Sequence, residues 1–422
     1  MTSSVAVIGA GLIGTTTAWY LAERGFDVTV LDRREGPALE TSYANGGLLT
    51  PSEADPWNAP GTLGRLLRWL GREDSPLLLR PAALPGMLRW GIDFLRASRP
   101  VPHRHSTEAI LRLALYSIHA LNELRYQLNL DYAALGNGTV KIFRDYRALE
   151  QSLELAEALR PLGLESHPLK PSAAAALEPL LSVIADQLAG AIHYPADQSG
   201  DAHLFTLEMA KHAATAGVKF RFNTSVQAIH ADGAHIGGLI TQQDEIHADI
   251  YVLAAGSYSP LLVRPLKLRL PIYPVKGYSV TIAPAQGYSL RVPVVDSEQK
   301  LVLTPLGDRL RIAGTAEFNG YDITLNTARS GSILRQAMAI LPGLAGPIGQ
   351  GGAISWTGLR PMTCDGPPVL GEAPYGNLFF NTGHGPLGWT LCAGSARIVA
   401  DAIAGRTPDI DPGAYRFSRF MR

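Results

Sequence analysis

Three glycines near the N-terminus are spaced as Gly-x-Gly-x-x-Gly, at Gly9, Gly11 and Gly14. In this pattern the first glycine permits a tight turn, the second lets a phosphate approach the backbone, and the third lets a helix pack close to a strand. The N-terminus of that helix would offer free N–H groups and a positive dipole end to the phosphate. Asp32 follows at a position where a carboxylate would accept hydrogen bonds from ribose hydroxyls. Together these residues predict a dinucleotide site.

The elements around these residues occur in the order that this chemistry needs. Residues 5–8 form an apolar run of strand length, residues 15–24 have helical spacing and stop before Gly25, and residues 28–31 form a second apolar strand. Strand, glycine turn, helix, strand and acid thus fit within about 30 residues, as in a βαβ unit. The cofactor contacts expected here are Gly9, Gly11, Leu12, Ile13, Gly14, Asp32 and Arg33.

Two further glycine-rich segments favour FAD over NAD. Residues 40–47 form a loop of small residues suited to lying against a flat ligand, where a simple NAD domain would usually continue with a helix. Residues 383–389 form a second loop, between a strand at 378–382 and a helix at 390–404, and the dipole of that helix would stabilise the anion of a reduced flavin. The expected contacts are Thr41, Ser42, Ala44, Asn45, Gly46, Gly47, Gly385, Leu387, Gly388, Trp389 and Thr390.

A third region supports the same cofactor. Residues 249–257 predict a buried strand that runs into small residues, with neighbouring strands at 218–222 and 225–229. Val226, Ala255 and Gly256 are the contacts expected from it. Other strands are predicted at 139–143 and 190–194, and a hairpin at 301–304 and 309–313.

Length and composition limit the alternatives. A chain of 422 residues is long for one core, so two domains are expected. Lys and Arg number 37, as do Asp and Glu, and this zero net charge argues against a general electrostatic grip on nucleic acid. Two cysteines are too few for a disulfide framework or a Cys-rich metal site. We find neither an apolar run of 18 residues nor a signal peptide, so a cytoplasmic protein is expected.

Taken together, six segments resemble a known family. They are the Gly9–Asp32 unit, residues 40–47 (ETSYANGG), 254–258 (AAGSY), 271–278 (PIYPVKGY), 357–362 (TGLRPM) and 381–390 (NTGHGPLGWT). They resemble, in the same order, bacterial D-amino acid dehydrogenases of the small-subunit type, within the superfamily of D-amino acid oxidase, glycine oxidase and sarcosine oxidase. The resemblance spans nearly the whole chain.

The resemblance implies an α/β fold with noncovalent FAD. A Rossmann-like FAD-binding domain would comprise residues 1–50, 200–265 and 351–422, and a substrate domain with a mixed or antiparallel sheet would comprise 51–199 and 266–350. The implied reaction is oxidative deamination of D-amino acids to 2-oxo acids and ammonia, with electrons passed to a quinone-linked acceptor. Two alternatives remain open: a D-proline, hydroxyproline, glycine or sarcosine enzyme, and a flavin subunit active only within a larger complex.

Four residues are the expected catalytic group. Arg360 would clamp the substrate carboxylate, because a guanidinium matches a carboxylate in a bidentate fashion and the family's arginine in this stretch has that role. Tyr278 could share the carboxylate and Lys276 could act on the amine or the flavin edge, or either side chain could be structural. His384 could hydrogen-bond the flavin or substrate, or serve the loop. No general base and no metal ligand are assigned.

Residues 56–105 differ in composition from the rest of the chain. They contain eight arginines and three acidic residues, a net charge of +5, together with Trp57, Trp69 and Trp90. Two apolar stripes occur at helical spacing, and their residues are Leu63, Leu66, Leu67 and Leu70, then Met87, Leu88, Ile92 and Leu95. Such stripes suit peripheral contact with the cytoplasmic face of the inner membrane, or packing on the substrate domain.

Overall fold

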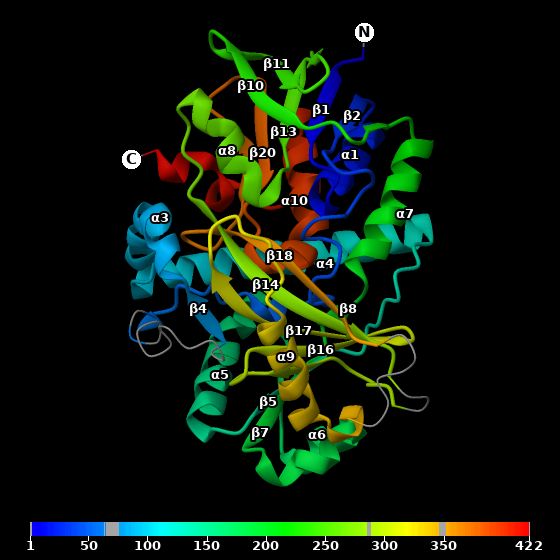
Figure 1. Cartoon of the computed structure of the whole chain (residues 1–422), viewed down its shortest axis with the longest axis vertical. Coiled ribbons are helices and arrows are strands. Elements are labelled where there is room, and N and C mark those ends of the chain that lie inside the picture. The colour runs from blue at the N-terminus through cyan, green and yellow to red at the C-terminus, as the bar shows by residue number, and fades with distance from the viewer. Residues whose placement is uncertain (1, 63, 65–75, 285–287, 346–351, 422) are drawn as a thin grey trace.

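Two β-sheets divide the molecule into halves, one above the other in Figure 1. This computed structural model describes residues 2–62, 64, 76–284, 288–345 and 352–421. The upper half is built on a six-stranded sheet and the lower half on a nine-stranded sheet. The long helix α4 (Pro100–Leu128) crosses the molecule where the halves meet.

The six-stranded sheet has the order β19-β20-β13-β1-β2-β9. Its strands are β1 (Ser4–Ile8), β2 (Asp27–Leu31), β9 (Lys219–Arg221), β13 (Ile250–Leu253), β19 (Val369–Glu372) and β20 (Leu378–Thr382). All neighbours pair in parallel except the edge strand β19. Because β1 lies between β2 and β13, the strand order reverses there, and such a reversal forms a ligand crevice at the carboxyl ends of the strands.

Both faces of this sheet are covered. One face contacts the helices α1 (Leu12–Glu23), α7 (Ala202–Thr215) and α10 (Gly388–Ile403). The other contacts α8 (Ser259–Val263) and a three-stranded sheet of β10 (Val226–Asp232), β11 (His235–Thr241) and β12 (Glu245–Ile246). Double coverage explains why residues 5–8 are apolar without alternation, since both sides of the strand are buried.

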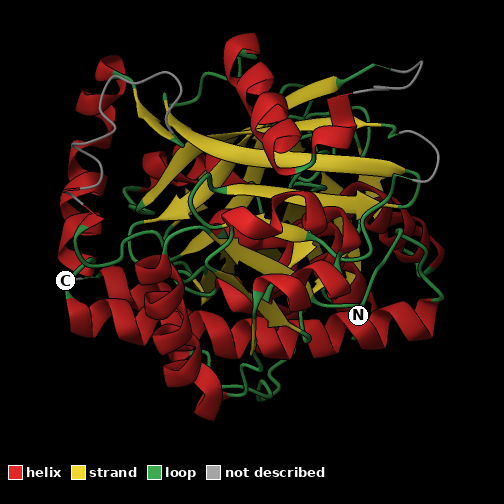
Figure 2. Cartoon of the chain, turned by 90° about the horizontal axis from the view of Figure 1, so that it is seen from below, coloured by secondary structure: helices red, strands yellow, loops and turns green. Residues whose placement is uncertain are grey.

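The nine-stranded sheet has the order β18-β14-β17-β16-β15-β5-β7-β6, with β4 paired to β17. Its strands are β4 (Leu77–Leu79), β5 (Thr139–Phe143), β6 (His167–Leu169), β7 (Gly190–Tyr194), β14 (Ile272–Ile282), β15 (Val294–Asp296), β16 (Leu301–Leu306), β17 (Arg309–Phe318) and β18 (Ile354–Thr363). The helices of this half are α3 (Leu84–Ala97), α5 (Tyr146–Leu159), α6 (Pro171–Leu177) and α9 (Thr327–Ile340). Figure 2 shows these long strands with helices around them.

A short antiparallel pair joins the halves: β3 (Leu48–Leu49) and β8 (Gln198–Ser199). Most predicted elements are confirmed, among them the strands at 139–143, 190–194 and 378–382 and the hairpin β16–β17 around Gly307. Two placements are wrong. The strands at 218–222 and 225–229 were expected beside the strand at 249–257. Instead, β9 pairs with β2 at the far edge of the six-stranded sheet, and β10 pairs with β11 in a separate sheet.

The predicted α/β class, with a Rossmann-like half and a mixed-sheet half, is confirmed. The domain boundaries stay a prediction. Two elements bear on these boundaries. Strand β18, from the segment 351–422, belongs to the nine-stranded sheet, and α4, from the segment 51–199, packs on α10 of the upper half. The upper half and the lower half therefore share more of the chain than a division by segments conveys.

Helix α3 carries two apolar faces. Trp90 and Phe94 are buried against Tyr273 and Phe318 of the large sheet. On the other face, four apolar side chains are 40–66% exposed: Leu84, Leu88, Ile92 and Leu95. Of the predicted stripe, Leu88, Ile92 and Leu95 are thus exposed, and only Met87 packs, partly buried, on the cluster of Trp90 and Phe94. The stripe of Leu63, Leu66, Leu67 and Leu70, and Trp69 with it, lies outside the described residues.

Candidate active site

A cavity of about 1410 Å³ lies between the two sheets. The upper half contributes the turn after β1, the loop after β2, the end of β13 and the start of α10. The lower half contributes the middle of β14, β17 and β18. Typical ligand pockets measure about 300–1,000 Å³, so this cavity has room for a cofactor and a second ligand together.

The glycines of the N-terminal turn are required by close packing. Gly9 has φ +110°, and a Cβ on it would lie 2.7 Å from the Ala254 carbonyl oxygen. A Cβ on Gly14 would lie 1.9 Å from the Gly9 carbonyl oxygen, so only glycine lets α1 approach β1 this closely. Gly11 is the N-cap residue of α1 and has no side-chain cap. The first turn of α1 therefore offers N–H groups to the cavity, as a pyrophosphate site needs.

Asp32 ends β2 beside this turn. Its Oδ2 accepts a hydrogen bond from the Ala10 N–H at 2.6 Å and its Oδ1 accepts one from the Arg34 N–H at 2.9 Å. Burial raises the pKa of Asp32 although these two bonds oppose that shift. The carboxylate lines the cavity with lone pairs left to accept from hydroxyl groups. Arg33 lies on the same wall, paired with Glu40 at 2.7 Å and stacked over Tyr258.

The loop of residues 41–47 is fastened to the large sheet through its backbone. The carbonyl oxygens of Ala44, Asn45 and Gly46 accept hydrogen bonds from Ser279 at 2.6 Å, Arg311 at 2.8 Å and Thr304 at 2.7 Å respectively. Those donors come from β14, β17 and β16. The upper half thus presents a flat strip of small residues whose position the lower half sets. Nearer the turn, Ser42 Oγ accepts from the Leu12 N–H, and Thr41 donates to Leu359.

The C-terminal loop forms another wall. Gly385 (φ +57°), Leu387, Gly388 and Trp389 line the cavity, and α10 begins at Gly388. His384 lines it as well, with its Nε2 3.0 Å from Ser395 Oγ, and burial lowers the pKa of His384 to about 3. The imidazole is therefore neutral at pH 7 and can act only as a hydrogen-bonding group there.

Arg360 projects from β18 into the cavity. Its guanidinium lies over Gly277 of β14, where a Cβ would come within 2.4 Å of it. Arg360 Nη1 donates to the Thr315 carbonyl oxygen at 3.1 Å, and its charge faces the Trp57 ring at 5.7 Å. No carboxylate pairs with it in the described part of the chain, and burial lowers its pKa to about 10. A partly buried cation without a counter-ion among the described residues is a strong site for a carboxylate ligand.

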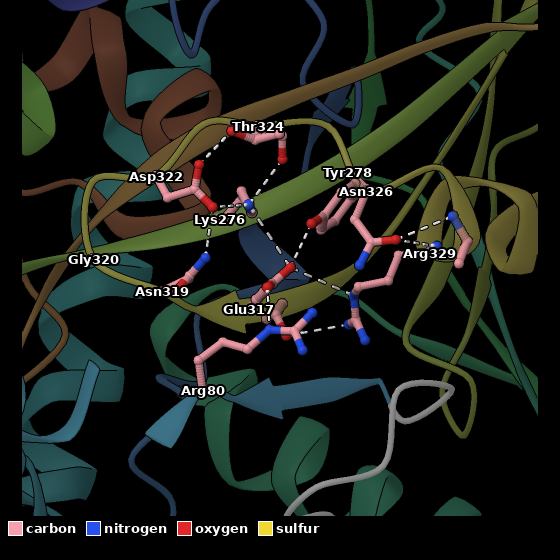
Figure 3. A network of polar contacts seen from close by, with 12 residues as sticks. Arg80, Lys276, Tyr278, Glu317, Asn319, Gly320, Asp322, Thr324, Asn326 and Arg329 are labelled. Atoms are coloured by element: carbon pink, nitrogen blue, oxygen red, sulfur yellow. Dashed lines mark hydrogen bonds and ion pairs between the residues drawn. The ribbon is translucent and has the colours of Figure 1, made fainter. Parts of the chain in front are cut away.

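Lys276 and Tyr278 belong to the same strand but point the other way, because neighbouring side chains of a strand alternate between its faces. The Lys276 Nζ donates to the Thr324 carbonyl oxygen at 3.0 Å and to Asp322 at 3.3 Å, and Lys276 does not line the cavity. Tyr278 reaches the cavity wall, but its hydroxyl donates to Glu317. Figure 3 shows both side chains in one polar network around Glu317.

The structure brings nearly all the sequence-predicted residues to one cavity. Val226, Ala255 and Gly256 line it as well, whereas Gly14, Thr390 and Lys276 do not. Thr390 instead accepts a hydrogen bond from the Thr50 N–H at 3.0 Å. Sequence reasoning missed several lining residues, chiefly Trp57, Thr315, Trp356 and Gly358. The alternation of strand residues back from Arg360 to 358 and 356 would have found the last two.

The fold and this cavity are those of a flavin oxidoreductase. The profile of the family described as FAD dependent oxidoreductase matches residues 4–402, and the chain belongs to that family. The chain is 47% identical over 423 residues to the D-amino acid dehydrogenase of Paramagnetospirillum magneticum, covering 99% of this chain and 98% of that protein. It is 44% identical over 411 residues to that of Dechloromonas aromatica, covering 96% and 98%. The resemblance inferred from the sequence is confirmed.

Solved structures agree on the fold. Glycine oxidase from Geobacillus kaustophilus has a TM-score of 0.77 at 23% identity, covering 99% of both chains. L-proline dehydrogenase from P. horikoshii has a TM-score of 0.79 at 20% identity, covering 100% of this chain and 98% of that one. The two act on different substrates, so the shared fold does not by itself fix substrate or stereochemistry.

The residues of this cavity fit FAD. The glycine turn and the start of α1 suit the pyrophosphate, and the free lone pairs of Asp32 suit the ribose. The strip 41–47 and the start of α10 line the cavity with several small residues, among them Ala44, Gly46, Gly47 and Gly388, which let a ring system approach the backbone. Neither Cys364 nor Cys392 lines the cavity in the part of the chain that the structure describes.

Proposed function

We propose that the chain is an FAD-dependent D-amino acid dehydrogenase with noncovalently bound cofactor. The observation that carries the proposal is the guanidinium of Arg360, which pairs with no carboxylate of the described residues and lines a cavity that fits FAD. When bound, FAD supplies the acceptor for a hydride from the substrate Cα. The resulting imino acid is hydrolysed by water to a 2-oxo acid and ammonia. Support for the D configuration is the 47% identity, over nearly the whole chain, to a D-amino acid dehydrogenase.

The residues of the large sheet hold the substrate. Arg360 binds the carboxylate, and Gly277 beneath it leaves the space that the guanidinium needs. Gly358, directly opposite Gly277 on β18, in turn accommodates the ring of Trp356, which a Cβ would meet at 2.1 Å. Two glycines therefore form a flat floor with a cation and an aromatic ring lying on it.

Proton handling needs no strong base in the chain. Hydride transfer requires the neutral amine, and water in a cavity of this size can take the proton from the substrate ammonium. His384 is neutral at pH 7 and is held by Ser395, so it is available as a hydrogen-bonding group for the flavin or substrate. Its role, like those of Tyr278 and Lys276, is part of the proposal.

Anaerobic titration of the purified protein tests the reaction. The absorbance band near 450 nm belongs to the oxidised flavin. Its loss is followed while D-alanine, D-proline, glycine or sarcosine is added. We expect bleaching by D-alanine and other D-amino acids. Bleaching by D-proline, glycine or sarcosine alone would assign the chain to one of the other flavoenzymes of this fold.

The electron acceptor is proposed to be a quinone-linked carrier at a membrane surface. Among the described residues, no helix is long and apolar enough to cross a membrane. The exposed face of α3 suits peripheral binding to the cytoplasmic face of the inner membrane: Leu88 is 66% exposed, Ile92 is 43% exposed, and Arg89, Arg96 and Arg99 are exposed beside them. Apolar side chains flanked by arginines favour the interface of anionic lipid.

The double substitution Leu88→Glu and Ile92→Glu tests this contact. We expect binding to vesicles containing anionic lipid to weaken by about tenfold or more, since two exposed apolar side chains are lost. Activity with a soluble dye should stay unchanged. Val183→Glu, at a side chain 57% exposed elsewhere, is the matched control. Equal vesicle binding by the double variant and the control would reject α3 as the contact.

A separate experiment tests the electron acceptor itself. We expect the reduced enzyme to reduce a soluble quinone analogue and to form little peroxide in air.

A further inference from the structure

Figure 3 shows Glu317 within a buried polar network. Glu317 pairs with Lys276 and Arg360 pairs with Val275, so the network and the Arg360 guanidinium lie on opposite faces of the large sheet. Arg80 donates to it at 2.8 Å, and Lys276 and Arg329 each lie 3.9 Å away. Burial alone would raise the pKa of Glu317, but the hydrogen bonds from Tyr278 and Arg80 and the charges of Lys276 and Arg80 hold it below its usual value. Three cations thus surround one ionised carboxylate.

Such a network is weak evidence of added stability. Taking charges out of water costs about as much as their attraction returns, and apolar residues of similar volume often serve stability equally well. A buried ionic network does, however, hold its members in one geometry. The network therefore acts through the part of the backbone whose conformation it fixes.

The fixed part is a strained bulge in β17. Gly277 pairs with Ala316 and Tyr278 pairs with Gly314, so Thr315 is an extra residue without a partner on β14. Its φ is +57°, a left-handed conformation that is costly for a β-branched residue and persists only where the surroundings enforce it. They do so here, because Arg329 donates to the Ala316 carbonyl oxygen at 3.4 Å and the Ala316 N–H donates to Pro76 at 2.7 Å.

The bulge has a direct consequence on the other face. It turns the Thr315 carbonyl oxygen toward Arg360, which donates to it at 3.1 Å. In the described part of the chain this is the single hydrogen bond of that guanidinium within the protein. The direction of the guanidinium therefore depends on a peptide whose conformation the Glu317 network helps to impose. Only the backbone at Gly277 separates the Glu317 network from the Arg360 guanidinium.

We propose that Lys276, Tyr278 and Glu317 are positioning residues that aim Arg360 through the Thr315 peptide. This inference rests on the proposed function, in which Arg360 binds the substrate carboxylate. Lys276 and Tyr278 then act without touching the substrate. The network also carries three cations against the carboxylates of Glu317 and Asp322, so it adds positive potential behind the carboxylate site.

Tyr278→Phe tests the proposal most gently, because it removes the hydroxyl that donates to Glu317 and keeps the ring. A misaligned clamp should raise the KM for D-alanine about 10- to 100-fold while the rate at saturation changes less than threefold. Lys276→Met and Glu317→Gln should shift KM in the same direction. If Glu317→Gln fails to fold, Tyr278→Phe and Lys276→Met decide the matter alone. Unchanged KM in both would overturn the proposal.

A double-substitution cycle separates positioning from a general structural role. In an Arg360→Lys background, where the fork that the network aims is gone, Tyr278→Phe should change KM less than twofold. If the effects of Tyr278→Phe and Arg360→Lys on KM add in full, the network acts elsewhere than on Arg360, and the proposal is contradicted. Asp401→Asn is the control, since it breaks the buried Arg24–Asp401 pair (2.6 Å) outside the cavity and should lower the melting temperature without raising KM.

Binding of propionate, a carboxylate without an amine, is followed by the flavin spectrum in the same variants. Tyr278→Phe should weaken propionate and D-alanine equally. A loss confined to D-alanine would place the effect on the amine and overturn the assignment to Arg360. Because propionate is not oxidised, this readout stands even if no D-amino acid bleaches the wild-type flavin, in which case the proposed function fails and the positioning proposal is still decided.

Discussion

The two ends of the cavity are built from different parts of the chain. The proposed nucleotide end is shaped by close backbone packing, because a Cβ on Gly9 or Gly14 would collide with main-chain atoms. The proposed substrate end is shaped by charged side chains, with Arg360 on one face of the sheet and the Glu317 network on the other. The first end depends on the absence of side chains and the second on their exact charges. They should therefore fail in different ways when they are altered.

Gly14→Ala is expected to have the largest effect, at the nucleotide end. The new Cβ would lie 1.9 Å from the Gly9 carbonyl oxygen, so α1 must move away from β1. We expect a cost of about 3 kcal/mol or more and loss of most bound FAD. The ratio of flavin to protein after purification measures this. Normal FAD content in the variant would show that α1 can relax around the added methyl group.

Arg360→Ala should break only the substrate end. Removing the proposed carboxylate clamp is expected to lower kcat/KM for D-alanine by about 100- to 1,000-fold. FAD affinity should stay within twofold of wild type, because the glycine turn and Asp32 are untouched. Steady-state kinetics together with flavin titration check both parts. Loss of FAD alongside activity would show that the two ends are not separable.

Asp197 makes the stability of the folded protein depend on pH. It is buried beside the cavity wall, where Ser52 Oγ donates to it at 2.5 Å and Thr139 Oγ1 at 2.6 Å. Burial raises its pKa to about 7, against those hydrogen bonds. A carboxyl with a raised pKa contributes stability at low pH that is lost as pH rises from its unfolded value, near 4, through 7.

Asp197→Asn should remove this contribution. The free energy of unfolding of the variant, measured relative to wild type by urea denaturation, should therefore increase from pH 5 to about pH 7 and level off by pH 8. A constant difference across that range would mean that Asp197 is ionised in the folded protein at all of these pH values.

Gly86→Ala is the matched control for Gly14→Ala and carries the smallest expected effect. Gly86 lies inside α3, and a Cβ there meets nothing within 4 Å. Alanine in an open helical position should stabilise the protein by about 0.5–1 kcal/mol, without change in FAD content. A melting curve and the flavin ratio are sufficient. A destabilising effect would show that α3 is packed more closely than its described neighbours indicate.

The same contrast explains what the sequence could predict. The nucleotide end was predictable because a requirement for glycine at fixed spacing leaves a direct trace, as at Gly9 and Gly14. The strip 41–47 was recognisable for a similar reason, since small residues replace a helix. The parallel strands around it were predictable as continuous apolar runs, although the partners of β9 and β10 were not, because an apolar run does not reveal which strand it pairs with.

The substrate end was less predictable. Arg360 was found through a family resemblance, and the alternation of a strand would have separated Lys276 and Tyr278 from Gly277 without telling which face the cavity occupies. Thr315 left no signal, because its left-handed conformation is unusual for threonine and is imposed by contacts far apart in the chain. Its role depends on packing that only the folded chain displays.

The most direct test of the account is the rate at which D-alanine reduces the bound flavin in the absence of oxygen. Stopped-flow traces are compared for D-alanine, L-alanine and D-alanine carrying deuterium at Cα. The account predicts rapid bleaching by D-alanine, a severalfold slower rate with deuterium, and no bleaching by L-alanine. Equal rates for the two enantiomers, or no effect of deuterium at any concentration, would contradict hydride removal from the Cα of a D-amino acid held by Arg360.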